Sequence, residues 1–197
     1  VNNVTDKPII FSAPMVRALL DGRKTQTRRI VKSTAIIDLC NGLKSATGLA
    51  AQDTSDLPVR VNVGDRLWVR ENFCLCGQMD SVKSSECSQY EPVGYLADGA
   101  IREMACGMLS QGKTRPSIHM PRWASRLTLT VKDVRIERLQ GITRGDAMGE
   151  GCPHPNMAKC PDPRDWFHDL WNQINGPTAR ESKPKNNTNP ITTHPQD

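Results

Sequence analysis

The feature that most constrains the fold is a helix pattern that stops at a glycine and passes at once into a strand pattern. Ser12 is a good N-cap residue, and apolar side chains then recur at helical spacing as far as Gly22, a residue type that commonly follows a helix end. Over residues 25–31 the period of the pattern becomes two, as in a strand. The sequence therefore predicts a helix, a glycine turn and a strand between Ser12 and Val31.

Further strand patterns follow along the chain. Residues 59–71 read as a strand, a Gly64-Asp65 turn and a second strand, and residues 92–97 as a strand that ends at an Asp98-Gly99 turn. The longest strand pattern covers residues 125–139. The segments between these patterns are predicted to be loops.

Two more helices are predicted in the last third of the sequence. Thr143 and Asp146 have capping-box spacing, which opens a short helix through Glu150. Asp162 caps a second helix whose apolar stripe is predicted to lie in the core: Trp166, Phe167, Leu170, Trp171 and Ile174. Short strands interleaved with three helices favour an α+β domain built on a small β-barrel with long loops. We place this domain at residues 7–176, followed by a disordered or atypical tail at 177–197.

Positive charge is concentrated in two segments. Residues 1–32 hold seven Lys and Arg against two Asp, which gives 7 − 2 = +5, and residues 113–138 hold seven against one Asp and one Glu, again 7 − 2 = +5. Because the whole chain carries +5, the remainder sums to −5. If the fold brings the two segments together, they indicate a phosphate-bearing partner. The alternative is two solvated strands with scattered charge.

Several classes of protein are disfavoured by the sequence. No apolar run approaches a membrane-spanning length and the N-terminus has no signal-peptide pattern, so we expect no membrane partner and a cytoplasmic location. Seven cysteines without an export signal are expected to be free thiols. Two sets could be considered for zinc, Cys74-Cys76 with Cys87 and Cys152-His154 with Cys160. Neither has the paired two-residue spacers of structural zinc sites, so we expect no metal and no cofactor.

The pattern Gly22-x-Lys24-x-x-Thr27-x-Arg29 resembles the signature of ASCH domains, small PUA-like β-barrels associated with RNA binding and modified-nucleoside chemistry. Other segments resemble the phage and prophage branch of that family, in the family's order: 7–11, 64–73, 95–99, 116–134, 142–151 and 167–176. The resemblance implies a PUA-like barrel in a protein of a bacterial host cell. The tryptophan-rich strand that closes the barrel in this branch has no counterpart in residues 177–197.

The resemblance also implies which residues form the site. In an ASCH subfamily that hydrolyses the acetyl amide of N4-acetylcytidine, the lysine and threonine of the motif act with a downstream glutamate. Lys24, Thr27 and Glu150 match these three and are the predicted catalytic residues. Lys24 could act as a base only with a lowered pKa. Residues predicted to bind substrate or nucleic acid are Arg23, Arg28, Arg29, Trp68, Arg70, Glu71, Arg122 and Trp123.

Three functions remain open from the sequence. The first is a non-catalytic protein that binds RNA or a modified nucleoside in a basic cleft around residues 22–29. The second is an amidohydrolase that removes the acetyl group of N4-acetylcytidine-type nucleosides, and a weaker third is a ribonuclease. The catalytic geometry poses a specific question, because residues three apart in a straight strand point to opposite faces. Lys24 and Thr27 converge only if the chain bends near Thr25.

Overall fold

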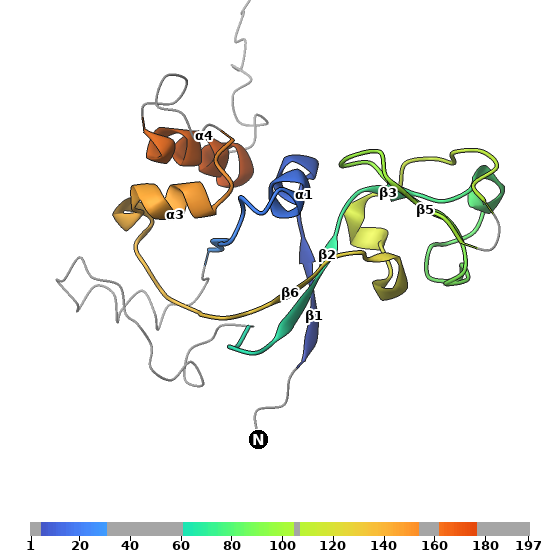
Figure 1. Ribbon diagram of the computed structural model, residues 1–197, viewed down its shortest axis with the longest axis horizontal. Helices are drawn as coiled ribbons and strands as arrows, with labels where there is room; N and C mark the ends of the chain where they lie inside the picture. The colour runs from blue at the N-terminus through green and yellow to red at the C-terminus, as the bar shows by residue number, and fades with distance from the viewer. Residues whose placement is uncertain (1–4, 31–60, 105–106, 154–161, 177–197) are drawn as a thin grey trace, which may run out of the picture.

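The computed structural model describes residues 5–30, 61–104, 107–153 and 162–176, and these form an α+β domain (Figure 1). Its strands are β1 (Asp6–Ile10), β2 (Arg66–Arg70), β3 (Phe73–Cys74), β4 (Val93–Tyr95), β5 (Ile101–Arg102) and β6 (Thr128–Thr130). Its α-helices are α1 (Ala13–Leu20), α3 (Arg144–Gly149) and α4 (Pro163–Asn175). Short 3-10 helices lie at η1 (Gly77–Met79), η2 (Ser117–His119), η3 (Arg122–Ala124) and η4 (Leu139–Gly141).

The first sheet joins the N-terminal strand to two strands from the middle of the chain. Its order is β1-β2-β6, with β1 parallel to β2 and β2 antiparallel to β6. Because side chains alternate along a strand, Ile9, Val69 and Leu129 share the face that packs against α1. Phe11 and Val16 complete this core. The sheet and α1 therefore hold the start of the 22–29 segment against a buried apolar layer.

The second sheet has its own core. Its order is β3-β4-β5, all antiparallel, and it lies beside the first sheet in Figure 1. Phe73, Val93, Tyr95 and Met120 are buried together at its surface. The predicted strand over 92–97 is thus confirmed in a shorter form as β4, and Gly99 has the positive φ (+76°) that the predicted turn requires.

The helix and glycine turn at the start of the chain are confirmed. The α1 helix follows Ser12, which has the extended conformation of an N-cap but forms no side-chain cap bond. Gly22 has φ +70°, and its N–H donates to the Leu19 carbonyl at 3.0 Å. This is the left-handed geometry that favours glycine after a helix.

The strand predicted after this turn is wrong for the residues that are described. Lys24 forms an isolated bridge with Glu150, and residues 25–30 form no strand. The physical reason is that the N–H groups of Thr25 and Gln26 both donate to one acceptor, the carbonyl of Gly149, at 2.7 and 2.9 Å. The chain is anchored to the end of α3 instead of pairing regularly with a neighbouring strand.

The long strand predicted over 125–139 is also wrong in extent: the strand within it is limited to β6 (Thr128–Thr130), and Ile136 forms an isolated bridge. The partner strand β2 begins at Arg66, directly after the turn at Gly64. The hydrogen bonds between β2 and β6 therefore end with the one from the Gly64 N–H to the Val131 carbonyl, at 2.9 Å. On the other side of that turn, residues 61–63 form no strand. Residues 59 and 60 lie outside the described residues.

The two C-terminal helices begin where predicted. Thr143 and Asp146 form a reciprocal capping box on α3, and the Asp162 side chain accepts from the Arg164 N–H at the start of α4. The core prediction for the α4 stripe is correct for Phe167, which is buried, but wrong for Ile174, which is exposed. Among the described elements α4 packs mainly along α3 (Figure 1), and a pair of helices buries only a narrow strip of each.

The predicted barrel stays a prediction. The strands of the described residues form two separate three-stranded sheets. The tail at 177–197 and most of the predicted loop at 33–58 lie outside the described residues. None of the helices in the described part of the chain combines the length and apolar character needed to cross a bilayer.

Asp65 gives the first sheet a pH-dependent anchor. Its carboxylate accepts from the Thr5 hydroxyl (2.7 Å), the Asn62 N–H (2.8 Å) and the Lys7 ammonium (2.6 Å). The bond from Lys7, followed by those from Asn62 and Thr5, holds the pKa of Asp65 well below its ordinary value of 3.8. A carboxyl whose pKa is lower in the folded state stabilises the fold above its unfolded pKa and loses that effect as the pH falls through the folded pKa.

Asp65→Asn should therefore lower the free energy of unfolding by about 2 kcal/mol at neutral pH. The difference from the wild type should shrink as the pH falls below about 4, where the wild-type carboxyl begins to lose its advantage. Urea unfolding between about pH 7 and pH 2 measures this. Asp169→Asn, at an exposed carboxylate on α4, is the control and should have little effect. A pH-independent difference for Asp65→Asn would contradict the prediction.

Candidate functional site

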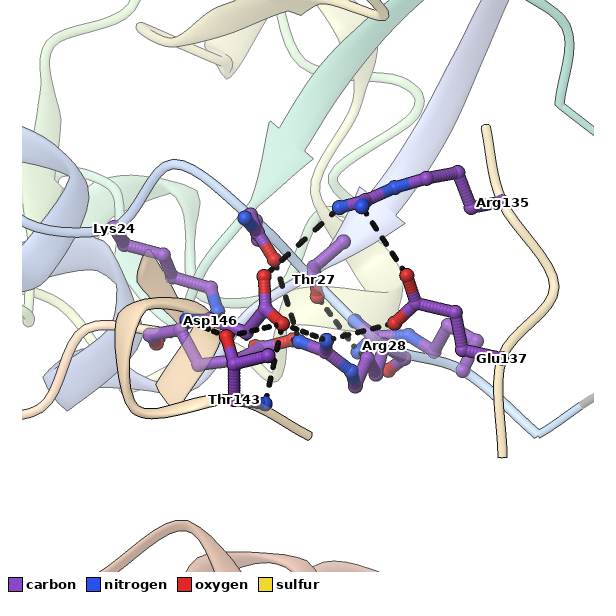
Figure 2. Close-up of polar contacts among 10 residues, drawn as sticks. Lys24, Thr27, Arg28, Arg135, Glu137, Thr143 and Asp146 are labelled. Atoms are coloured by element: carbon purple, nitrogen blue, oxygen red, sulfur yellow. Dashed lines mark hydrogen bonds and ion pairs between the residues drawn. The ribbon is translucent and has the colours of Figure 1, made fainter. Parts of the chain in front are cut away.

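The 22–29 segment and the end of α3 meet to form the candidate site, although they are more than a hundred residues apart in the chain (Figure 2). The Lys24 N–H donates to the Ala18 carbonyl at 2.9 Å, which continues the chain directly from α1. The bridge between Lys24 and Glu150 then joins the segment to the residue that caps α3. The predicted catalytic residues Lys24 and Glu150 are thus brought into contact.

The contact between these two side chains is a buried ion pair. The Lys24 Nζ lies 2.8 Å from Glu150 Oε2 and also donates to the Glu150 carbonyl at 2.9 Å. Both residues are only 4% exposed. Burial lowers the pKa of Lys24; the Glu150 carboxylate acts in the opposite direction, and the charges of Arg29 and Arg28 add to the lowering. The pKa of Lys24 is thus shifted in the direction that the catalytic hypothesis requires.

A glycine makes room for this pair. Gly151 follows Glu150 with φ +102°, a conformation that other residues rarely adopt. A Cβ at this position would lie 3.0 Å from the Ala18 Cβ and 3.3 Å from the Lys24 Cβ. The close approach of α1, Lys24 and the turn after α3 therefore depends on a residue with no side chain.

Arg28 contacts three carboxylates at once. Its Nη1 lies 3.3 Å from Glu150 Oε1, and its Nη2 lies 3.1 Å from Glu137 Oε2 and 3.4 Å from Asp146 Oδ2. The two Glu150 oxygens are therefore held by different cations, Lys24 on one and Arg28 on the other. This arrangement orients the carboxylate and neutralises Arg28, which makes Arg28 less suited to phosphate than the sequence alone indicated.

Asp146, Glu137 and Arg135 are site residues that sequence reasoning missed. Figure 2 shows Arg135 and Glu137 reaching the cluster from the segment after β6, with Arg135 Nη1 3.2 Å from Glu137 Oε1. Asp146 accepts from the Thr143 hydroxyl, the main reason that its pKa is lowered. The capping box was the available signal for Asp146. Nothing in the sequence indicated that 135–137 would lie here.

Thr27 and Arg29 lie at the exposed side of the site. Both residues are exposed, and the Thr27 hydroxyl accepts from Arg29 Nη1 at 3.1 Å. The irregular course of residues 25–30 removes the strand geometry that would have put Lys24 and Thr27 on opposite faces. The Thr27 hydroxyl is bonded to Arg29, so a direct Lys24–Thr27 contact stays a prediction.

Three other predicted binding residues gather on the first sheet. Trp68 is 8% exposed, and its ring has the Arg70 guanidinium 4.6 Å and the Arg122 guanidinium 5.8 Å from its centroid. Arg122 also lies 3.5 Å from the Asp6 carboxylate. Trp68 is thus covered by arginines, which leaves little of its ring open to stack on a base.

The remaining predicted residues have protein partners. Glu71 is 2% exposed and receives two hydrogen bonds from Arg126 (2.9 and 3.0 Å). Trp123 packs on the second core with a guanidinium over its ring, and Arg23 bonds Asp21 through Nε and Nη2. These contacts favour structural roles for Glu71 and Trp123.

The cysteines form no recognisable metal centre in the described part of the chain. Cys74, Cys76 and Cys87 are buried free thiols, and Cys152 is also buried. Among the described residues, no three or more His, Cys, Asp or Glu side chains are placed to hold a metal ion. The other two members of the second set considered for zinc lie outside the described residues.

No protein-family model matches the chain, and comparisons with curated proteins and with solved structures give no match. The resemblance to ASCH domains therefore depends on the motif residues themselves. A functional proposal for this chain has to be argued from the Lys24–Glu150 pair and the residues that contact it.

Proposed function

We propose that this protein is an ASCH-type, PUA-like domain that binds a modified nucleoside, free or within RNA, at the Lys24–Glu150 pair. The observation that carries the proposal is this pair itself: a buried amine and a buried carboxylate in contact, with two exposed residues, Thr27 and Arg29, in the same segment as Lys24.

The chemistry of the pair matches that of a cytosine edge. The N4 group of cytosine donates hydrogen bonds, for which a carboxylate such as Glu150 is a natural acceptor. The ring nitrogen and the O2 carbonyl of cytosine are acceptors, for which the Lys24 ammonium is a donor. Burying an ion pair costs desolvation energy that the attraction between the charges often fails to repay, so a buried pair is weak evidence of a purely stabilising role.

A second candidate function, hydrolysis of an N4-acyl cytidine, is favoured by the lowered pKa of Lys24. In this reaction neutral Lys24 takes a proton from a water whose oxygen forms a bond to the acyl carbon. Collapse of the tetrahedral intermediate breaks the bond between the acyl carbon and N4, and the proton returns through Glu150 to N4. Acetate and cytidine are released. Thr27 would orient the water or serve as the nucleophile itself.

Ribonuclease activity stays a prediction. Among the described residues, Lys24 and Glu150 form the pair on which the argument depends, and it fits a single base more directly than a phosphodiester.

The proposal is tested by measuring binding of cytidine and turnover of N4-acetylcytidine with the purified protein. We expect binding that Lys24→Met reduces at least about tenfold, since an ammonium hydrogen bond contributes roughly 1.5 to 3 kcal/mol. Lys83→Met, which removes a lysine at the surface, is the matched control. Thr27→Val distinguishes the two functions, and this exposed position should tolerate the substitution. If the protein hydrolyses N4-acetylcytidine, the Thr27→Val variant should lose turnover and still bind cytidine. If neither compound binds, the proposal is wrong.

A further inference from the structure

Arg29 differs from the other cations of the candidate site. Lys24, Arg28 and Arg135 each contact at least one carboxylate within 3.3 Å, and Arg23 is paired with Asp21 at 2.8 Å. Arg29 has no ion pair with any of the described residues, since its hydrogen bonds all go to neutral oxygens. Its guanidinium is therefore not engaged in an ion pair within the described residues.

The Arg29 guanidinium is nevertheless held in place. Nη1 donates to the Thr27 hydroxyl at 3.1 Å and to the Arg28 carbonyl at 3.0 Å, and Nη2 donates to the Ile10 carbonyl at 3.3 Å. The guanidinium carbon lies 5.6 Å from the centre of the Phe11 ring. A guanidinium has five N–H groups. Three of them fix the orientation of Arg29, and the other two, the Nε–H and one N–H of Nη2, donate to none of the described residues.

This arrangement suits an anion with two oxygens to offer. The Nε and Nη2 groups of an arginine can donate in parallel to two oxygens of one phosphate. Burial lowers the pKa of Arg29, and the charge of the Glu150 carboxylate acts in the opposite direction. An arginine stays protonated in proteins, so this group keeps its charge while part of its hydration is already lost. Because the side chain is already oriented, little rotamer entropy remains to be lost when an anion binds.

We propose that Arg29 binds a phosphate group of the ligand, so that this site takes a nucleotide, free or within an RNA strand, in preference to a nucleoside. The proposal rests on the proposed function, because it requires the base to occupy the Lys24–Glu150 pair. Arg28 was also predicted to bind substrate or nucleic acid. In the structure its guanidinium instead forms ion pairs with the carboxylates of Glu137, Asp146 and Glu150.

The test compares the affinities for cytidine, cytidine 5′-monophosphate, the dinucleotide CpC and inorganic phosphate by calorimetry. The wild-type protein should bind the monophosphate or the dinucleotide about 10- to 100-fold more tightly than cytidine. A greater gain for the monophosphate indicates a free nucleotide, and a greater gain for CpC indicates RNA. In Arg29→Gln the gain should disappear while cytidine binding persists, and Arg29→Lys should restore only part of it.

The matched control is Arg66→Gln, which removes an exposed arginine that already has a carboxylate partner, Asp6 at 2.7 Å. It should keep the gain from phosphate. The proposal is overturned if cytidine binds as tightly as the monophosphate and CpC, if Arg29→Gln keeps the gain, or if Arg66→Gln loses it equally. These outcomes leave nucleoside binding intact. Failure of all four ligands to bind overturns the proposed function as well.

Discussion

Replacing Glu150 with Leu should lower the free energy of unfolding by about 3 to 5 kcal/mol, because it leaves the Lys24 ammonium buried without a carboxylate. Lys24 is 4% exposed and would keep only the Glu150 backbone carbonyl of its two acceptors. Lys24→Met should cost less, because the carboxylate that it leaves behind still contacts Arg28 at 3.3 Å. We therefore expect Glu150→Leu to lower the free energy of unfolding more than Lys24→Met does.

The double variant Lys24→Met, Glu150→Leu should be more stable than the sum of the single effects predicts. Removing both charges leaves neither one buried alone, and a pair of apolar side chains can replace a buried ion pair at little cost. Chemical denaturation of the four proteins gives the interaction energy directly. Equal costs for the two single variants, or strict additivity, would contradict the prediction.

The pH dependence of Glu150→Leu provides a second check. A lysine whose pKa is lower in the folded state destabilises the fold while the unfolded chain binds the proton, and this penalty is relieved as the pH rises toward the unfolded value of about 10.4. Loss of Glu150 removes the charge that raises the Lys24 pKa. The deficit of Glu150→Leu relative to the wild type should therefore shrink as the pH rises toward about 10. Lys83→Met, at an exposed ion pair, should show no such trend and change stability by at most about 0.5 kcal/mol.

The second large effect is expected at Arg126. Arg126→Met should lower the free energy of unfolding by about 3 to 5 kcal/mol, because Glu71 would remain 2% exposed with a charge and no partner for its two oxygens. The variant also removes the guanidinium that lies 4.1 Å from the centre of the Tyr95 ring. Arg126 joins the end of β2 to the turn after β4, so its loss should destabilise both sheets.

Asp98→Asn is the matched control for Arg126→Met. Asp98 contacts the same guanidinium at 2.8 Å, but its side chain is 29% exposed and water can replace the lost contact. Its cost should be about 1 kcal/mol or less. Urea unfolding of the wild type and the two variants measures these losses in the free energy of unfolding. Similar costs for Asp98→Asn and Arg126→Met would show that the buried charge on Glu71 is not the dominant cause.

Local patterns predicted the elements whose limits are set by neighbouring residues. The glycine after α1, the capping box of α3 and the aspartate cap of α4 all occur as the sequence indicates, because each is decided by hydrogen bonds within a few residues. The strands predicted over 25–31 and 125–139 were less reliable. Whether an extended segment pairs depends on which partner lies beside it, and an alternating pattern contains no information on the partner.

The candidate site divides in the same way. The resemblance to ASCH domains pointed to Lys24 and Glu150, and the structure brings them into contact. Trp68 and Glu71 were predicted as ligand contacts from the chemistry of their side chains. In the structure, arginines lie over the Trp68 ring, and Arg126 forms an ion pair with Glu71. Arg135 and Glu137 carried no signal, because their place beside Arg28 follows from the course of the chain after β6.

The sequence by itself determined the glycine-ended helix, the capped helices and the basic 22–29 segment, since these depend on local conformational preferences and on composition. The tertiary structure alone decided which of the basic residues remain available to a ligand. Lys24, Arg28 and Arg29 look equivalent in the chain, but the end of α3 and the residues after β6 supply carboxylates that form ion pairs with the first two, whereas Arg29 forms no ion pair with the described residues. A charge becomes available or neutralised only through residues that folding places beside it, and Coulomb interactions depend on that distance in space and not on separation along the chain.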